Sequence, residues 1–389
     1  MTEVTEKRDN GKLIIGLSGR IDTSNAQEVE QSIRTILEKQ PAETVILDCE
    51  KLEYISSSGL RVLLRLHKEI SDIRMVNVSS EVYEIFEMTG FTEMMKIERA
   101  YKQLSIEGCT VIGEGAKGRV YRLDDETCVK VYFNPDSLED IKRERELARK
   151  ALIKGVNTAI SYDVAKVGDS YASVFELLNA RSFSWLIEND SEHIDDYIRM
   201  YVDLLKGIHA IEAREGELPD QKKEAMVWAQ WNKDYFNNEV GDKIYRLFEE
   251  IPENNHMIHG DFHTQNVMFQ NGEVILIDMD TVAMGDPIYE LGNIYQSFVA
   301  YNEVDHQHSW DFLGMSYEHT VYLWEKSLEL YMGTTDRKVL EEAENKAKIV
   351  AYARLLRRTV RKDSENTKLI DNCVRKLTEL VGKVDSLAL

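Results

Sequence analysis

The sequence lacks the features that mark several large classes of protein. No run of apolar residues among its 389 residues is long enough to span a membrane, so no membrane partner is expected. The segment from Met1 to Asn10 is too charged for a signal peptide, and no low-complexity linker or internal repeat is present. The cysteines have no metal-ligand spacing, which favours reduced thiols and a cytoplasmic location. They are Cys49, Cys109, Cys128 and Cys373.

Basic residues are also scarce relative to acidic ones. The chain has 48 lysines and arginines against 69 aspartates and glutamates, which gives a formal net charge of −21. Nucleic-acid phosphates attract basic surfaces, so we expect no nucleic-acid partner. The negative charge suits a cationic substrate, although an acidic surface also serves solubility alone. A length of 389 residues predicts more than one domain.

The first hundred residues alternate between strand patterns and helix patterns. Strands are predicted at Lys12–Ser18, Glu43–Cys49 and Arg74–Val78. Helices are predicted between and after them, at Thr23–Lys39, Ser57–Ile70 and Ser80–Met88. This alternation is typical of a small domain built on an α/β sheet.

Three segments of this region form a further pattern: Gly19–Asp22, Val45–Leu64 and Phe86–Phe91. Together they resemble STAS domains of the anti-sigma-factor antagonist type, and the resemblance covers residues 1–100. It implies a regulatory or docking domain that binds a protein partner, with Ser57 as the candidate phosphoacceptor. Ser56 stands where the family usually has aspartate, which bears on whether the usual phosphorylation switch operates.

Ser57 has two interpretations that the sequence leaves open. A phosphate on the residue that opens a helix meets free N–H groups and the positive end of the helix dipole. The hydroxyl groups of Ser56, Ser57 and Ser58 are equally suited to capping the same helix without any phosphorylation.

The C-terminal half contains the most informative segment, His259-Gly260-Asp261-Phe262-His263-Thr264-Gln265-Asn266, which is soon followed by Ile277-Asp278-Met279-Asp280. Between these motifs, Val267–Gln270 and Glu273–Ile277 are predicted strands joined by a two-residue turn. With that turn, position 270 pairs with 273 and position 266 with 277, so Asn266 and Asp278 lie at the same end of the hairpin. An amide oxygen and a carboxylate held this close suit a hard divalent cation such as Mg²⁺.

The spacing from His259 to Asp261 and Asn266, followed by Asp278, resembles that of protein-kinase-like phosphotransferases. Its local form resembles the aminoglycoside phosphotransferases and choline kinases. The resemblance implies an Mg²⁺-dependent enzyme that transfers a phosphoryl group from ATP or GTP to an alcohol group of a small molecule. Asp261 would position or deprotonate that hydroxyl, while Asn266 and Asp278 would bind the metal. Asp280 is either a further metal ligand or an acid that faces water.

The resemblance also suggests roles for residues around this segment. His259 and His263 are expected to hold the catalytic loop in place, and Asp286 resembles the aspartate that braces this loop in the family. No Ala-Pro-Glu follows Asp278, which favours a small-molecule acceptor over a protein. Two interpretations remain open for Trp228, Trp231 and Tyr235. They would form either a cage for a quaternary ammonium group or part of an ordinary hydrophobic core.

An independent motif upstream indicates nucleotide binding. Gly113, Gly115 and Gly118 are followed by a strand pattern at Arg119–Leu123, whereas a Rossmann glycine turn opens a helix. The lysine and serine or threonine that end a P-loop are missing as well. Two strands joined by a glycine loop suit a flap whose backbone N–H groups lie over phosphates.

The next predicted strand, Thr127–Phe133, places Val129, Val131 and Phe133 on one face and Lys130 on the other. By resemblance, Lys130 grips the α- and β-phosphates of the nucleotide. Without the resemblance it would be an edge-strand or snorkelling lysine.

Lys130 should have a glutamate partner on the following helix, which is predicted at Leu138–Lys154. We choose Glu144 over Glu146, because Glu144 shares a helix face with apolar residues and Glu146 lies among basic ones. The strand at Tyr171–Leu178 leads into a connector. By resemblance, the backbone of Glu176 to Leu178 binds the edge of the adenine or guanine base.

Helical patterns dominate the rest of the chain, at Ile194–Glu212, Tyr317–Tyr331, Thr335–Val360 and Thr367–Val381. The predicted fold is an α/β STAS domain at residues 1–100 plus an α+β protein-kinase-like bilobal domain. Its β-rich N-lobe is expected at 104–178 and its helical C-lobe at 179–389. The alternative to an enzyme is a non-catalytic regulator that senses nucleotide and acts through protein binding by the STAS domain. The presence of the expected catalytic residues favours the enzyme.

Overall fold

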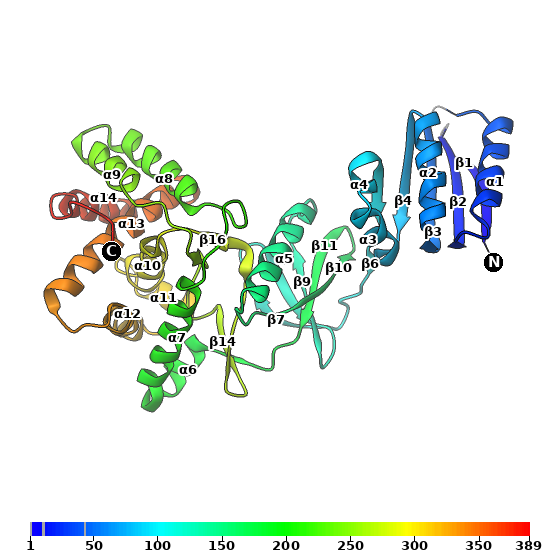
Figure 1. Cartoon of the computed structure of the whole chain (residues 1–389). Coiled ribbons are helices and arrows are strands. Elements are labelled where there is room, and N and C mark those ends of the chain that lie inside the picture. The colour runs from blue at the N-terminus through cyan, green and yellow to red at the C-terminus, as the bar shows by residue number, and fades with distance from the viewer. Residues whose placement is uncertain (1, 10–11, 43) are drawn as a thin grey trace. The chain divides into compact units, whose positions relative to one another are not determined.

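The computed structural model describes residues 2–9, 12–42 and 44–389, and their contacts separate into two compact units (Figure 1). One unit contains the residues up to Cys109 and two short segments, Val131–Pro135 and Val164–Ala172. The other contains Thr110–Lys130, Asp136–Asp163 and Ser173–Leu389. No helix among the described residues is both long and apolar enough to cross a membrane.

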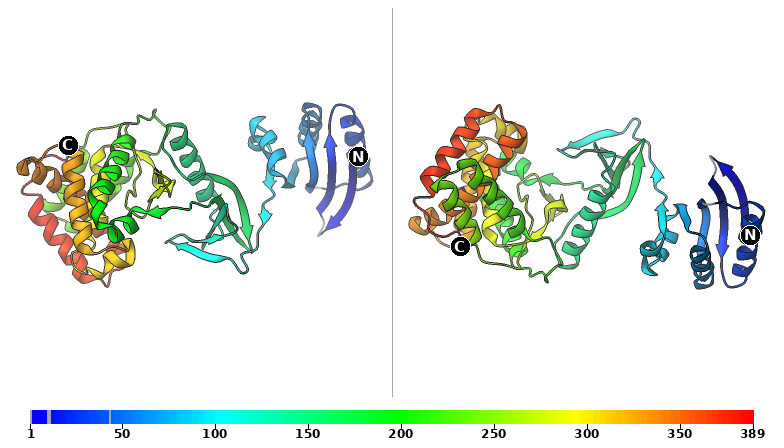
Figure 2. Two further views of the ribbon diagram at one scale, coloured as in Figure 1. Left: turned by 90° about the horizontal axis from the view of Figure 1, so that it is seen from below. Right: turned by 90° about the horizontal axis from the view of Figure 1, so that it is seen from above.

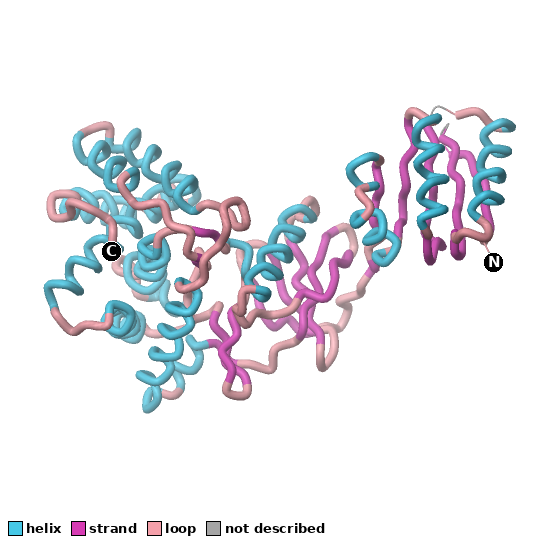
Figure 3. Tube along the Cα trace, in the orientation of Figure 1, coloured by secondary structure: helices cyan, strands magenta, loops and turns pink. Residues whose placement is uncertain are grey.

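The N-terminal region is a five-stranded sheet with helices packed on it, as the α/β prediction requires (Figure 3). The strand order is β1-β2-β3-β4-β5; β1 is antiparallel to β2, and the other neighbours are parallel. The strands are β1 (Glu3–Asp9), β2 (Lys12–Ile21), β3 (Thr44–Ile55), β4 (Asp72–Val78) and β5 (Lys96–Arg99). The helices are α1 (Ala26–Lys39), α2 (Ser57–Glu69), α3 (Ser80–Met88) and α4 (Phe91–Met94).

The predicted strands and helices of this region are present, with different ends. Glu43, the predicted start of the second strand, lies outside the described residues, and β3 begins at Thr44. β3 continues past the predicted end at Cys49, because Leu52 and Ile55 extend its buried face. The two outer strands, β1 and β5, were not predicted. Their burial patterns are mostly exposed or intermediate, so they lack the apolar signal of an inner strand.

A second sheet, of six strands, has the order β6-β10-β11-β9-β8-β7. Its strands are β6 (Lys102–Gln103), β7 (Thr110–Glu114), β8 (Gly118–Arg122), β9 (Thr127–Tyr132), β10 (Ser161–Val167) and β11 (Ser170–Glu176), and α5 (Leu138–Ile153) follows β9. β7 and β8 form the predicted antiparallel pair around the glycine loop. The prediction that Val129, Val131 and Phe133 share one face of β9 is wrong for Phe133. Val129 is buried, but Phe133 lies beyond the strand end and is 55% exposed.

The rest of the chain is mainly helical, as predicted, and its helices pack around one large core (Figure 2). The helices are α6 (Phe183–Asn189), α7 (Ile194–His209), α8 (Gln221–Phe236), α9 (Glu239–Glu249), α10 (Pro287–Tyr295), α11 (Gln307–Leu313), α12 (Tyr317–Met332), α13 (Arg337–Lys362) and α14 (Thr367–Leu380). Single helical turns occur at Ser191–His193 and Met279–Thr281, and a π-helical turn at Gln296–Ala300. The short strands are β12 (Arg181–Ser182), β13 (Met257–Ile258), β14 (Val267–Gln270), β15 (Glu273–Leu276) and β16 (Ala283–Met284).

Helix α13 is the main support of this region, since it contacts α8, α10, α12 and α14. Its close approach to α10 depends on Gly292. A Cβ atom at that position would lie 2.5 Å from Cγ1 of Val350 on α13. Helix α10 begins directly after the segment that carries the predicted site residues. Its packing therefore anchors that segment to the core.

The first helical turn of α2 supplies a test of packing in the N-terminal sheet. A Cβ atom at Gly59 would lie 2.6 Å from Cγ1 of Ile55 and 2.8 Å from Cγ2 of Ile21. We expect Gly59→Ala to lower the free energy of unfolding by about 1–3 kcal/mol, because this overlap outweighs the roughly 1 kcal/mol that alanine contributes to a helix. Urea denaturation followed by circular dichroism measures the change. Arg61→Ala, at an exposed position of the same helix, is the control and should change little. A stabilised Gly59→Ala protein would contradict this view of the packing.

Candidate active site

The β14–β15 hairpin places two of the predicted site residues at one end. Its register is the predicted one, with Gln270 opposite Glu273 and Val267 opposite Leu276. The pairing extends one step further, because the N–H of Ile277 donates to the backbone oxygen of Asn266 at 2.9 Å. Asp278 follows directly and has a left-handed backbone with φ of +60°. That conformation turns the chain out of the strand at the point where the predicted metal-binding acid stands.

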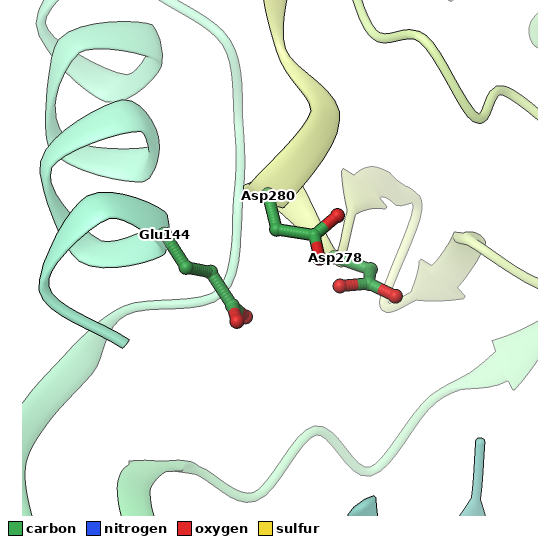
Figure 4. Close-up of side chains that lie close together, drawn as sticks. All are labelled: Glu144, Asp278 and Asp280. Atoms are coloured by element: carbon green, nitrogen blue, oxygen red, sulfur yellow. The ribbon is translucent and has the colours of Figure 1, made fainter. Parts of the chain in front are cut away.

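Three carboxylates gather next to this end of the hairpin (Figure 4). Oxygen atoms of Glu144, Asp278 and Asp280 all lie within 4.8 Å of one another. Glu144 comes from α5, and the two aspartates come from the segment after β15. Carboxylate oxygens are hard donors of the kind that Mg²⁺ prefers.

Two lysines lie among these acids. Nζ of Lys130 is 3.2 Å from Oε1 of Glu144 and 3.3 Å from Oδ1 of Asp278. Lys117, from the glycine loop, pairs with Asp280. Sequence reasoning missed Lys117 as a site residue, because nothing in its local pattern relates it to an acid 163 positions away.

The competing glutamate lies elsewhere. Glu146 is on the outer side of α5, where it pairs with Arg149 at 2.9 Å. Glu144, by contrast, is buried on the face that also contains Ile141 and Ala151. The structure therefore brings Glu144, and not Glu146, to Lys130.

Asn266 and His263 surround the third predicted catalytic residue, Asp261. Nδ2 of Asn266 donates to the backbone oxygen of Asp261 at 3.0 Å. Nε2 of His263 lies 3.5 Å from Oδ2 of Asp261 and 3.3 Å from Nδ2 of Asn266. Burial acts to raise the pKa of Asp261. The hydrogen bond and charge of His263, with smaller contributions from Arg354 and His259, outweigh burial and hold this pKa well below its ordinary value.

The predicted catalytic loop is braced from helix α10 by Glu290, a residue that the sequence analysis did not identify. Glu290 is fully buried, and its carboxylate accepts hydrogen bonds from the backbone N–H groups of His259 and Gly260. Nδ2 of Asn293, one turn further along α10, donates to the backbone oxygen of Gly260 at 2.9 Å. Gly260 has φ of +83°, and a Cβ there would lie 2.5 Å from the oxygen of Thr281. The loop can therefore follow this path only with glycine at 260.

The expectation that Asp286 braces this loop is wrong. Its Oδ1 instead accepts a hydrogen bond from the N–H of Ile288 at 3.0 Å and caps α10, with Pro287 in the first turn. This is ordinary capping chemistry, because an acid before a helix can satisfy one of its free N–H groups. His259 contributes to the brace through its backbone, while neither of its ring nitrogens has a hydrogen-bond partner among the described residues.

The glycine loop closes in a hairpin, with the N–H of Gly115 donating to the oxygen of Gly118 at 2.9 Å. Gly113, Gly115 and Gly118 all have negative φ, so their backbone conformation does not itself demand glycine. A Cβ atom at Gly115 would meet nothing within 4 Å. The loop thus presents backbone to open space, which is the property that a flap over phosphates needs.

The predicted base-binding residues lie after β11. The N–H of Glu176 donates to Ile160 at 3.2 Å and that of Leu177 donates to Glu126 at 2.7 Å. Both N–H groups are therefore already used within the protein. Among the described residues, no hydrogen bond is formed by the backbone of Leu178, which leaves its groups for a ligand.

Ser57 is the exposed first residue of α2. The capping role belongs to Ser56, whose Oγ accepts from the N–H of Gly59 at 3.5 Å. Oγ of Ser58 donates to Oγ1 of Thr23 at 3.4 Å. The three serines therefore differ in their hydrogen bonds. Ser56 and Ser58 each form a side-chain hydrogen bond, whereas the hydroxyl group of Ser57 forms none among the described residues.

A glycine flap, a strand lysine paired with a helix glutamate, and an aspartate loop followed by a hairpin define a protein-kinase-like phosphotransferase. Comparison with protein families agrees. Residues 108–310, more than half of the chain, match the model of the phosphotransferase enzyme family, and residues 2–104 match the STAS domain. The chain belongs to this phosphotransferase family and carries an N-terminal STAS domain.

Individual relatives and structures support the same division. The N-terminal region is 30% identical over 99 residues to BtrV of Bordetella bronchiseptica, named as a candidate anti-sigma factor antagonist, covering 24% of this chain and 84% of BtrV. It is 25% identical over 99 residues to the anti-sigma F factor antagonist of Paenibacillus polymyxa, covering 24% and 85%. The crystal structure of aminoglycoside phosphotransferase APH(4)-Ia has a TM-score of 0.50 and 15% identity, covering 72% of this chain and 97% of that chain. A mutant of it in complex with ADP and hygromycin B also has a TM-score of 0.50, with 14% identity and coverage of 71% and 96%. At these identities the structural likeness concerns the fold.

The Glu290 brace gives a prediction about stability and pH. Glu290→Gln keeps the size of the side chain but removes the charge that two backbone N–H groups share. We therefore expect it to lower the free energy of unfolding by about 1.5–3 kcal/mol at pH 7. Burial acts to raise the pKa of Glu290, but His209, His259 and the bond from Gly260 together lower it. A lowered folded-state pKa stabilises the protein above the unfolded-state pKa of about 4.3, and that stabilisation is lost as the pH falls below it.

The difference between wild type and Glu290→Gln should therefore shrink below about pH 4, as measured by urea denaturation between pH 7 and pH 3.5. Glu341→Gln, at an exposed position of α13, is the matched control and should show no such difference. A difference that stays constant over this range would show that the charge of Glu290 does not hold the loop.

Proposed function

We propose that this protein is an Mg²⁺-dependent phosphotransferase that moves the terminal phosphoryl group of ATP or GTP to a hydroxyl group of a small molecule. The observation that carries the proposal is the contact of Lys130 with both Glu144 and Asp278, next to Asp280. This arrangement joins the residue expected to bind phosphates to the acids expected to bind a metal.

The donor set fits a divalent cation. Glu144, Asp278 and Asp280 present only carboxylate oxygens, and the cations that now lie against them are the ammonium groups of Lys117 and Lys130. Asp278 and Asp280, with the side-chain oxygen of Asn266, would hold Mg²⁺. When bound, Mg²⁺ would neutralise charge on the nucleotide phosphates.

The protein's own groups would then bind the phosphates and the base of the nucleotide. Lys130, held by Glu144, binds the α- and β-phosphates, and the backbone of the glycine loop at Gly113, Gly115 and Gly118 covers them. The backbone of Leu178, with the backbone oxygen of Glu176, binds the base edge. These contacts fix the terminal phosphorus in line with the acceptor.

Asp261 handles the acceptor hydroxyl. Its lowered pKa keeps it ionised at neutral pH, so it is a weak base that orients the hydroxyl rather than removing its proton early. In the transfer, a bond forms between the acceptor oxygen and the terminal phosphorus while the bond to the nucleoside diphosphate breaks. The hydroxyl proton passes to Asp261 as the new bond forms.

Nucleotide binding should depend on metal through Asp278. With Mg²⁺ and nucleotide at about 100 times the dissociation constant, binding should stabilise the wild type by about 2.7 kcal/mol, seen as a rise in melting temperature. Asp278→Ala should lose the part of this shift that depends on Mg²⁺. Asp261→Asn should keep the shift, because Asp261 acts on the acceptor and not on the phosphates.

Thermal shift with ATP and with GTP, each with Mg²⁺ or with EDTA, measures both effects. No shift with either nucleotide in Mg²⁺ would overturn the proposal. A normal shift without turnover of any acceptor would favour the alternative, a nucleotide-sensing regulator.

We further propose that the STAS domain is a docking module whose candidate switch is Ser57. The exposed position of Ser57 at the start of α2 supports this, because added negative charge there meets the positive end of the helix dipole. A phosphate would thus be tolerated by the helix and would change the charge seen by a protein partner.

The physical basis of that switch can be measured. At low ionic strength, Ser57→Glu should stabilise the protein relative to Ser57→Lys by about 0.6–2 kcal/mol, since each charge interacts with the helix end by about 0.3–1 kcal/mol. Lys68, in the last turn of α2, is the control of opposite sign, and Lys68→Glu should destabilise. Equal stability of the two Ser57 variants in urea denaturation would remove the helix-start argument for phosphorylation.

A further inference from the structure

The glycine loop between β7 and β8 carries a basic side chain to which the proposed mechanism assigns no role. Lys117 is the only basic residue between the end of β7 and the start of β8. Its ammonium group pairs with the carboxylate of Asp280, which lies in the single helical turn after β15. The contact therefore joins the tip of the flap to the three acids Glu144, Asp278 and Asp280, hereafter the acid cluster.

The hairpin that carries Lys117 is closed by its own backbone. β7 and β8 pair in antiparallel fashion from Thr110 opposite Arg122 to the loop, where the N–H of Gly115 donates to the oxygen of Gly118 at 2.9 Å. The side chain of Lys117 is 58% exposed and takes no part in this closure. Its replacement should therefore leave the hairpin formed.

The two ends of the contact differ in burial. The side chain of Asp280 is only 13% exposed, so the acid lies within the site and the lysine reaches in from solvent. Little packing holds such a lysine in place, and the attraction between the two charges is what joins the flap to the acid cluster.

Lys117 is held less firmly than the other lysine at the acid cluster. Nζ of Lys130 lies 3.2 Å from Glu144 and 3.3 Å from Asp278, and the side chain of Lys130 is 16% exposed. Lys117 pairs with one carboxylate in the described part of the chain and is largely in solvent. A solvent-exposed ion pair favours the closed contact by no more than about fivefold, so Lys117 can be displaced from Asp280 by another cation.

The other basic residues of the β7–β8 hairpin are used within or beside it. Nε of Arg119 lies 2.7 Å from Oε2 of Glu114, and Nη2 of Arg122 lies 2.6 Å from Oδ1 of Asp125. Their charges are thus paired with acids of the same part of the chain. Lys117 is the positive charge that the flap directs to the acid cluster.

A divalent cation at Asp280 and the ammonium group of Lys117 would compete for one carboxylate. Two cations this close repel, so binding of the metal favours release of Lys117. The metal would arrive with nucleotide phosphates, whose negative charge exceeds what one divalent cation neutralises. A lysine ammonium group binds phosphate oxygens as a mobile point charge. The flap that would cover the phosphates therefore carries an ammonium group that can exchange its carboxylate partner for a phosphate oxygen.

We propose that Lys117 is a phosphate-binding residue that changes partner when the nucleotide binds. In the nucleotide-free protein it pairs with Asp280 and disfavours a metal ion there. With metal and nucleotide bound, it contacts the phosphate chain and holds the flap over it. This inference rests on the proposed phosphotransferase function and adds an order of binding at the same site, in which the metal enters with the nucleotide and not before it.

The test uses Lys117→Met in the full-length protein, because methionine keeps most of the length of the side chain and removes the charge. Without nucleotide, the variant should bind Mn²⁺, a probe for Mg²⁺, about two- to fivefold more tightly than the wild type, since no ion pair has to be broken. Electron paramagnetic resonance of the free Mn²⁺ measures this affinity. With Mg²⁺ present, a non-hydrolysable ATP or GTP analogue should bind about 10- to 100-fold more weakly in calorimetry, since a charged hydrogen bond is lost.

The opposite signs of the two changes make the test specific, because damage to the flap or to the fold would weaken both kinds of binding. Lys117→Arg keeps the positive charge and should retain the metal affinity of the wild type and most of its nucleotide affinity. Arg119→Gln removes a positive charge from the same hairpin that lies at Glu114, and it is the matched control. It should leave both affinities unchanged.

The outcomes separate this inference from the proposed function. If the wild type binds the nucleotide analogue and Lys117→Met binds it equally well, the phosphate contact is overturned and the phosphotransferase function stands. If Lys117→Met does not strengthen Mn²⁺ binding to the nucleotide-free protein, or if neither protein binds Mn²⁺, the exchange of partners is overturned. Absence of nucleotide binding by the wild type overturns the phosphotransferase function and this inference with it.

Discussion

Three carboxylate groups whose oxygens lie within 4.8 Å of one another repel strongly unless positive charge is placed among them. Lys130 supplies that charge to Glu144 and Asp278, and Lys117 supplies it to Asp280. Because Lys130 comes from β9, Glu144 from α5 and the aspartates from the turn after β15, this one balance of charge relates three separate elements. The three carboxylates outnumber the two ammonium groups, and a divalent cation bound at Asp278 and Asp280 would offset the remaining negative charge.

The loop that carries Asp261 depends on a second buried charge. Glu290 fixes the N–H groups of His259 and Gly260, and the glycine at 260 permits a path that passes against the oxygen of Thr281. The position of Asp261 is thus determined from helix α10, which packs on α13 through Gly292.

The sequence predicted the structure best where residues close together in the chain determine how side chains are placed. The two-residue turn at Asn271-Gly272 determines which residues pair across the hairpin, and helical periodicity separates Glu144 from Glu146. The class of fold followed from these motifs together. Residues that act over long sequence distances could not be found in this way. Lys117 and Glu290 reach partners on other elements, and nothing in their local patterns distinguishes them from surface lysine or ordinary helical glutamate.

The β14–β15 hairpin has a consequence for how this chain can vary. Its strands have only four residues each, and side chains alternate faces with a period of two. The number of residues between Asn266 and Asp278 therefore determines whether their side chains lie together. Inserting a single residue within either strand would turn Asn266 or Asp278 away from the other. Changes in length can be accommodated at the exposed turn, where Asn271 and Gly272 project from the hairpin. Variation in length should thus concentrate at the tip, while the length of the two strands should stay constant.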